Sequence, residues 1–148
     1  MKNTIKYLVL FLTVVSLSSA CLGQSQISEP ADQEDTNSEL VVLWTTAEKE
    51  VLMKMLGIYV LNAKKQTWFE NITVIVWGPS AKLLAEDKEV QDWITKFKEA
   101  GVTLEACMWC TNQYGITEDL KAMGIDVKGM GTQLTKYLKD SGKEVIVF

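Results

Sequence analysis

Two cysteines, Cys107 and Cys110, are the residues of this sequence best suited to chemistry, and their spacing is Cys-x-x-Cys. A thiolate is a strong nucleophile, and a position just ahead of a helix stabilises it. Such a residue can accept a sulfur atom as a persulfide, attack a disulfide, or pair with its neighbour. Residues three apart lie on one side of a helical turn, so the spacing allows the two thiols to face each other.

The residues around the pair predict that it lies where a strand passes into a helix. The run from Val102 to Ala106 is typical of a short strand, and a helix is expected to start after Cys107. α/β proteins commonly carry their functional side chains at this end of a strand. The structural alternative makes Cys107 a small core residue at the strand end and packs Cys110 beneath the helix.

Composition excludes several other classes of site. The 148 residues include no histidine, which rules out Ser-His-Asp and Cys-His catalysis and every histidine-containing metal site. Two cysteines do not complete a tetrahedral zinc site, so a metal would need cysteines from several chains or added carboxylates. No glycine-rich phosphate cradle is present, and no cofactor is expected.

The charge of the chain argues against nucleic acid as a partner. The formal net charge is −4, and it becomes −6 without the N-terminal lysines Lys2 and Lys6. A phosphate backbone needs a basic surface, which an acidic domain lacks. Hydrophobic residues make up 47% of the sequence, enough for one domain with a proper core.

The first twenty residues have the layout of a bacterial secretory signal. A short basic lead, residues 1–6, precedes the apolar run 7–17, which is too short to span a bilayer comfortably. Ser18-Ser19-Ala20-Cys21 follows, and it is similar to a lipobox with Ser18 where leucine is usual. Either Cys21 becomes lipid-modified, or a signal peptidase cuts after Ala20. Both alternatives predict an exported protein of the periplasm or cell envelope, the first one anchored to the membrane.

A flexible polar tether, residues 21–39, is expected next, because residues 24–39 contain almost nothing apolar. The folded domain is expected to cover residues 40–148. Its first helix should begin with a capping box at Thr45 and Glu48, and Met55 and Ile58 belong to the apolar stripe predicted to be buried. Asp87 and Gly101 are expected to cap and close a later helix.

Apolar runs and helical stripes alternate along the domain, which predicts a mostly parallel five-stranded sheet with helices on both faces. The last helix is expected to bury Leu134, Tyr137 and Leu138. If the first and third strands flank the reversal of strand order, Trp44 and Thr45 face Cys107, with Trp77 on the same rim. Together with Trp109 these residues are candidates for a pocket or a subunit interface, although packing is the commoner role of aromatic residues there. The predicted strands are 40–44, 72–77, 102–106, 125–127 and 145–148.

From Leu40 to Phe148 the sequence resembles the DsrE/DsrF-like family of sulfur-relay proteins. The resemblance lies in the opening Val42-Leu43-Trp44-Thr45, the segment from Trp77 to Leu84, and the stretch from Glu105 through Cys107 and Cys110 to Gly115. It implies a three-layer α/β/α sandwich in the flavodoxin-like topology class, and assembly into trimers or hexamers.

The resemblance also implies a role for Cys107, which lies eight residues before Gly115, as does the sulfur-carrying cysteine of relay members. That role is to carry sulfur as a persulfide between a donor and an acceptor, a protein or a small thiol. Relay members have basic residues ahead of this glycine, where Gln113 and Tyr114 stand here, and they lack an export signal. Cys110 lies outside their basic pattern and is expected to act as a resolving or partner thiol. The alternative is a non-enzymatic binding or oligomerisation module with structural cysteines.

Overall fold

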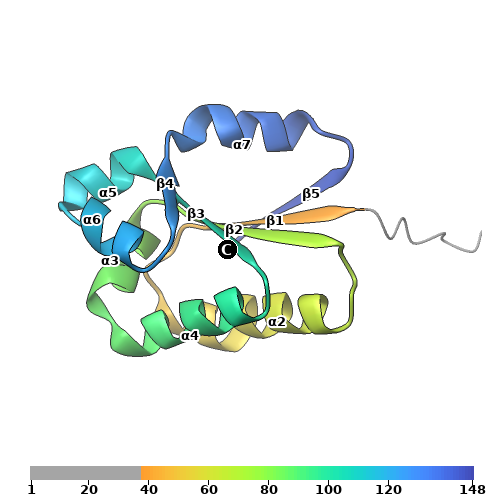
Figure 1. The fold of residues 1–148 in the computed structure, drawn as a ribbon, viewed down its shortest axis with the longest axis horizontal. Helices are drawn as coiled ribbons and strands as arrows, with labels where there is room; N and C mark the ends of the chain where they lie inside the picture. Colours follow the sequence, from red (N-terminus) through yellow and green to blue (C-terminus); the bar gives the residue numbers. More distant parts are fainter. Residues whose placement is uncertain (1–37) are drawn as a thin grey trace, which may run out of the picture. The chain divides into compact units, whose positions relative to one another are not determined.

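A computed structural model describes residues 38–148, so the predicted signal segment, most of the tether and Cys21 lie outside the described residues. Five strands form one parallel sheet in the order β4-β3-β2-β1-β5 (Figure 1). The strands are β1 Glu39–Trp44, β2 Asn71–Val76, β3 Thr103–Cys107, β4 Asp126–Lys128 and β5 Lys143–Val147. The helices are α1 Lys49–Val51, the π-helical segment η1 Leu52–Leu56, α2 Gly57–Lys65, α3 Pro79–Glu86, α4 Lys88–Glu99, α5 Met108–Tyr114, α6 Thr117–Ala122 and α7 Met130–Lys139.

The predicted α/β/α class and the five-stranded parallel sheet are confirmed. The strand order, however, separates the first and third strands. β1 pairs with β2 and β5, whereas β3 pairs with β2 and β4. The chain steps from β1 to β4 in one direction, and α7 then carries it back to place β5 beside β1. This differs from the 2-1-3-4-5 order of flavodoxin itself.

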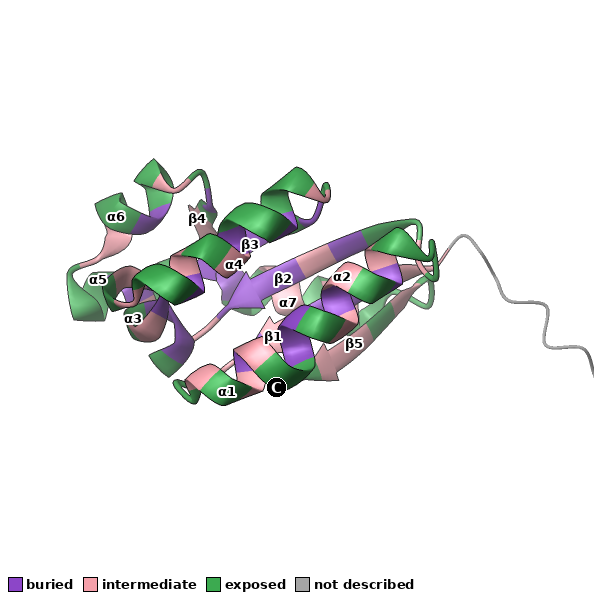
Figure 2. Ribbon diagram, turned by 90° about the horizontal axis from the view of Figure 1, so that it is seen from below, coloured by how far each residue is buried: buried purple, intermediate pink, exposed green. Residues whose placement is uncertain are grey.

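The two faces of the sheet are covered unequally. Helices α2 and α4 lie on one face and α7 covers the other, while α3, α5 and α6 gather at the end where the strands finish (Figure 1). Successive strand residues point to opposite faces, so Val42 and Val74 enter the core under α2 and α4, and Val41 and Ile75 face α7. In Figure 2, viewed from the α2/α4 side, both helices alternate buried and exposed residues along their length.

The first long helix differs from its prediction in register. Its buried residues are spaced by four, Leu52, Leu56 and Val60, and Gly57 packs against Trp93 so closely that a Cβ there would lie 2.6 Å from a ring carbon. Met55 and Ile58 are 55% and 46% exposed, so their predicted burial is wrong. The Gly57–Trp93 contact fixes which side of the helix meets α4, and the π-helical turn shifts the residues before it.

The predicted capping box is also wrong. Thr45 directs its Oγ1 to the carbonyl oxygen of Phe148 at 2.8 Å, and the helix begins later, at Lys49. Glu48 occupies the N-cap position and makes no side-chain capping bond. The bond from Thr45 therefore fastens the last residue of the chain to the end of β1.

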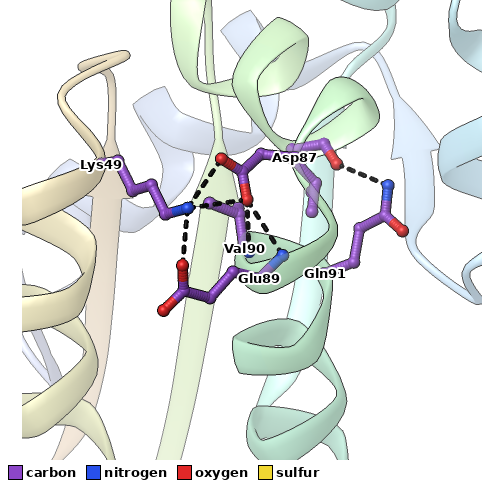
Figure 3. Close-up of polar contacts among 6 residues, drawn as sticks. Lys49, Asp87, Glu89, Val90 and Gln91 are labelled. Atoms are coloured by element: carbon purple, nitrogen blue, oxygen red, sulfur yellow. Dashed lines mark hydrogen bonds and ion pairs between the residues drawn. The ribbon is translucent and has the colours of Figure 1, made fainter.

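Asp87 caps α4 as predicted, and it also joins two helix starts (Figure 3). Its Oδ1 accepts hydrogen bonds from the backbone N–H groups of Glu89 and Val90 at 2.9 and 3.2 Å. Lys49 at the start of α1 lies 2.9 Å from Asp87 Oδ2 and 2.7 Å from Glu89 Oε2. The hydrogen bond from Lys49 and those from the backbone lower the pKa of Asp87, while Glu89 and Asp87 raise the pKa of Lys49.

On the α7 face, Met130 is fully buried and Leu134 and Tyr137 pack beside it. Leu138 is 63% exposed, so its predicted burial is wrong. One helix over five strands cannot cover the whole face, and Val147 in the edge strand β5 is likewise 63% exposed. Among the described residues, no helix is long and apolar enough to cross a membrane.

Candidate functional site

Cys107 is the last residue of β3 and the N-cap of α5, with φ −73° and ψ 111°. The chain passes directly from strand to helix at this point, as the sequence predicts. Helix α5 ends at Gly115, whose φ of +70° allows the N–H of Ile116 to reach the carbonyl of Thr111 at 3.0 Å. The helix is short, and Thr111 is its one fully buried residue.

The side chain of Cys107 is less accessible than the chemical interpretation requires. Cys107 is 3% exposed and packs with Ile75, Met130 and Trp77 beneath α7. The persulfide chemistry expected of Cys107 needs an accessible sulfur, and in the folded domain this sulfur is buried. The reason is geometric: β3 lies between β2 and β4, and alternation along the strand turns its last side chain toward the face that α7 covers. Cys110 is only partly buried and is the thiol nearer to solvent.

The two thiols are free, and they interact with each other. Burial raises the pKa of the Cys110 thiol above its ordinary value, and a hydrogen bond with Cys107 raises it further. The backbone N–H of Gly78 acts in the opposite direction and lowers this pKa. Cys110 therefore keeps its proton near neutral pH, and its side chain packs against the cluster that contains Cys107.

The segment after β2 supplies the other wall of this site. Gly78 has φ +72° and ψ −133°, a conformation that favours glycine, and it presents its N–H to Cys110. Ser80, fully buried, donates a hydrogen bond to the carbonyl of Trp44 at 2.7 Å and accepts one from the N–H of Trp77 at 3.0 Å. These bonds hold the ends of β1 and β2 in fixed register beside the thiols.

Of the four residues proposed to line a pocket, the structure brings Trp77 and Trp109 to the thiols. Trp77 packs in the same cluster as Cys107 and Cys110, and Trp109, between them in sequence, is 70% exposed. Trp44 is fully buried in the core on the α2/α4 face, and Thr45 is bonded to Phe148. The predicted placement of Trp44 and Thr45 opposite Cys107 is wrong, because β2 separates β1 from β3.

Apolar side chains dominate the exposed surface next to the thiols. Met108 and Tyr114 on α5 are 39% and 41% exposed, in addition to Trp109. A shallow pocket of about 260 Å³ lies between α3 and the end of α5. Its lining consists of Ala47, Pro79, Lys82, Leu83, Glu86 and Tyr114, so neither cysteine contributes to it.

A buried polar cluster, which the sequence did not reveal, lies on the same face as Cys107. Glu105 is 4% exposed, and its Oε1 accepts hydrogen bonds from Lys128 Nζ at 2.7 Å and from the Tyr137 hydroxyl at 3.0 Å. Its Oε2 is buried without a partner. Burial by itself lowers the pKa of Lys128, but the hydrogen bonds to Asp126 and Glu105 outweigh that effect and raise it. Burial also raises the pKa of Tyr137.

One signal in the sequence could have pointed to this cluster, and one appears only in the structure. Glu105 is an acidic residue inside an otherwise apolar strand, two positions before Cys107 and therefore on the same face. Lys128 pairs with Cys107 in the register between β3 and β4, but only the strand order reveals that pairing. Within residues 38–148, no three side chains of the kinds that bind metal ions lie together.

Comparison with known proteins agrees with this geometry. The DsrE/DsrF-like family model matches residues 26–148. The chain belongs to the DsrE/DsrF-like family. This family is related to sulfur relay, and its assignment confirms the resemblance found in the sequence.

Two solved structures share the DsrE/DsrF-like fold. A conserved protein of unknown function from Bacteroides thetaiotaomicron, BT1422, is 39% identical with a TM-score of 0.72, over 75% of this chain and 95% of that one. The YchN protein from E. coli is 15% identical with a TM-score of 0.56, over 76% of this chain and 99% of that one. At that identity YchN supports the fold alone. No protein with a curated description matches this chain.

Proposed function

We propose that this protein carries sulfur as a persulfide on Cys107, with Cys110 as its proton donor and resolving thiol, outside the cytoplasm. The observation that carries the proposal is the contact between two free thiols at the carboxyl end of β3 in a DsrE/DsrF-like domain. A lone buried cysteine has no partner for such chemistry, whereas this pair has one within a helical turn.

Sulfur uptake is a simple exchange at this site. The thiolate of Cys107 attacks the outer sulfur of a donor persulfide, R–S–SH. The donor S–S bond breaks, R–S⁻ leaves, and Cys107 becomes Cys107–S–SH. Cys110 supports this step because its retained proton can hydrogen bond to the sulfur of Cys107.

Discharge can follow either of two routes. An acceptor thiolate can take the outer sulfur, which returns Cys107 to a thiolate. Alternatively Cys110 attacks the inner sulfur, which forms the Cys107–Cys110 disulfide and releases the outer sulfur as H₂S. An external dithiol reductant then restores both thiols.

Cys107 is buried where α7 covers the sheet, and α5 begins directly after it, so a partner reaches its sulfur only if α5 or the start of α7 moves. The shorter of the two is α5. That helix has seven residues, a single fully buried side chain and three exposed apolar ones, Met108, Trp109 and Tyr114. An element with so few buried contacts opens at low cost in free energy. The same side chains suit a protein partner with an apolar surface better than a small charged thiol.

Mass spectrometry of the reduced protein after incubation with a low-molecular-weight persulfide tests this function. The expected result is a gain of one sulfur on Cys107 in the native chain and in Cys110→Ser, and no gain in Cys107→Ser. The proposal is contradicted if the native protein neither gains a sulfur nor loses two hydrogens as the Cys107–Cys110 disulfide, and if Cys110→Ser gains no sulfur. A gain confined to Cys110 contradicts the assigned roles.

The burial of Cys107 favours a second candidate, a binding or homo-oligomeric module in which both cysteines are structural. Alkylation of the folded protein by a thiol reagent separates the two. A sulfur carrier exposes Cys107 to slow alkylation through opening of α5, whereas a structural residue reacts only at the rate of global unfolding.

Export and membrane attachment through lipid on Cys21 are part of the proposal. Intact-mass analysis of the protein from cells tests both, since lipid, simple cleavage after Ala20 and an uncleaved chain give three different masses. The same spectrum reports the sulfur state of Cys107 and Cys110.

A further inference from the structure

Trp68 is a large apolar side chain held outward at the opposite end of the sheet from the thiols. It lies in the loop 66–70 between α2 and β2 and is 48% exposed. In Figure 1 this loop is at the end of the sheet where β1 begins, whereas α5 and α6 are at the other end. Its ring lies 6.1 Å from that of Tyr59, centroid to centroid, so one side of the indole is packed and the other faces solvent.

The backbone that presents Trp68 is ordered and strained. The N–H of Trp68 bonds to the carbonyl of Ala63 at 3.0 Å, and the N–H of Thr67 bonds to that of Lys64 at 3.3 Å. These two bonds form a Schellman motif, which places Thr67 in the left-handed region with φ +54°. Three other helices of the domain end in the same motif with glycine at that position, Gly101, Gly115 and Gly124. A β-branched residue is costly there, and strain of this kind is a reason to look for function.

The loop also lies where the N-terminal segment joins the domain. The N–H of Glu70 donates a hydrogen bond to the carbonyl of Ser38 at 3.1 Å, and Ser38 is the first described residue. Lys64 closes the loop from the other side by donating to the carbonyl of Glu70 at 3.0 Å. The chain therefore enters the domain beside Trp68, so a surface that holds the N-terminal segment is linked to this end of the sheet.

The charges at this end of the sheet are mostly positive. Helices α2, α4 and α7 run back from the thiol end and finish here, and each carries two lysines in its last turn. This end is formed by the starts of β1 and β5 and by the loops that follow these helices, and we name it the tether edge. It carries Lys64, Lys65, Lys96, Lys98, Lys136, Lys139 and Lys143 against Glu39, Glu70, Glu99, Asp140 and Glu144, and Lys143 is paired with Glu39.

We infer that the tether edge contacts an anionic lipid bilayer, with Trp68 in the headgroup region and the lysines against the phosphates. Tryptophan and lysine are the residues that favour this interface, because the indole combines an apolar body with a polar N–H and the ammonium group pairs with phosphate. The parallel sheet then holds Cys107 and Cys110 at the end of the domain that faces away from the membrane. The inference rests on the proposed membrane attachment of the N-terminal segment and not on the sulfur chemistry.

Tryptophan quenching by brominated lipids tests the inference, because bromine on the acyl chains quenches only indoles at membrane depth. The full chain is attached to phosphatidylcholine vesicles with and without brominated phosphatidylglycerol. Trp68→Phe and Trp109→Phe form a matched pair, since both tryptophans are exposed but lie at opposite ends of the sheet. We expect the brominated lipid to quench at most the emission of one of the five tryptophans. This quenching should be absent in Trp68→Phe and unchanged in Trp109→Phe.

Three other results overturn the inference. Quenching that disappears in Trp109→Phe places the thiol end against the bilayer. Absence of quenching in the native chain that floats with the vesicles shows that another protein surface or a second copy covers Trp68. Quenching unchanged in both variants assigns the contact to other residues. A Lys65→Gln variant adds a control: its quenching should fall on vesicles that contain brominated phosphatidylglycerol and should be unchanged on vesicles of brominated phosphatidylcholine alone.

The two proposals fail independently. Persulfide uptake on Cys107 is measured in solution by mass, and Trp68→Phe should leave it at the native level. A protein that takes up sulfur but shows no quenching contradicts the membrane contact alone, and the reverse result contradicts the sulfur function alone.

Discussion

The two faces of the sheet are built from the same five strands but differ in what they bury. The face under α2 and α4 holds a cluster of twenty buried residues, all of them apolar. The face under α7 holds a cluster of four, Val41, Ile75, Cys107 and Met130, next to the buried carboxylate of Glu105. The first face therefore supplies most of the hydrophobic stabilisation, although it also buries Trp44 Nε1 without a partner, and the second accommodates the buried carboxylate.

This difference explains how a buried cysteine can still take part in chemistry. Opening the α2/α4 face would expose a continuous core. At the carboxyl end of the strands, displacing the short helix α5 exposes little apolar surface, because Thr111 is its one fully buried residue. The thiols thus lie at the part of the domain that moves at the least cost.

The largest expected loss of stability comes from truncating a buried side chain on the face under α2 and α4. Phe97 on α4 is fully buried, so Phe97→Ala should lower the free energy of unfolding by about 3–5 kcal/mol. Leu138→Ala on α7 is the matched control and should change it by less than about 0.5 kcal/mol, because Leu138 is 63% exposed. Urea unfolding of the two variants measures both values. Losses of equal size would show that the two faces contribute alike.

A smaller effect is expected from the polar cluster on the α7 face. Glu105→Gln removes the charge that pairs with Lys128 and weakens the bond from Tyr137, which should cost about 1–3 kcal/mol. Asp126→Asn breaks the other ion pair of Lys128 at an exposed carboxylate, and should cost less than about 1 kcal/mol. Thermal unfolding at neutral pH compares the two variants. If the Glu105→Gln protein were as stable as the native one, the charge of Glu105 would not contribute to stability.

The sequence predicted those features of the fold that depend on neighbouring residues. The strands follow from apolar runs. Asp87 caps α4 because its carboxylate accepts hydrogen bonds from the backbone N–H groups two and three residues later. Gly101 ends α4 because glycine adopts a φ of +77° without strain. The strand–helix junction at Cys107 followed from the same local signals. Each of these features is decided within one or two turns of the chain.

What the sequence did not predict depends on contacts between distant segments. The separation of β1 from β3 is set by how the helices cross the sheet, and it moved Trp44 and Thr45 away from the thiols. The burial of Cys107 depends on α7 covering its face, and the pairing of Glu105 depends on β4 lying next to β3. At Thr67 the sequence and the structure disagree in the opposite sense: a β-branched residue disfavours the left-handed backbone conformation, but the end of α2 imposes it.

The pH dependence of Cys110 alkylation measures how its environment differs from that of an ordinary surface thiol. Removing the neighbouring sulfur with Cys107→Ala eliminates the hydrogen bond that raises the pKa of Cys110, so its pH profile of alkylation should move to lower pH. Burial, the larger cause, persists, so the pKa of Cys110 should stay above the ordinary thiol value. Cys107→Ser keeps a hydrogen-bonding group and should move the profile less. A shift to higher pH would mean that Cys107 stabilises the thiolate of Cys110 instead of its thiol.

The smallest expected effect is at the end of α2, the one helix end within residues 38–148 where a β-branched residue takes the position that favours glycine. Glycine adopts φ +54° without steric cost, so Thr67→Gly should raise the free energy of unfolding, but a more flexible unfolded chain offsets part of the gain. A net increase of about 0.5 kcal/mol is expected, because strain of about 1 kcal/mol or more is relieved. Gly101→Thr imposes the same residue on the same motif at the end of α4, and should lower stability. If Thr67→Gly instead destabilises the protein, the Thr67 side chain makes a favourable contact that outweighs its strain, and the strain would no longer point to a function for Trp68.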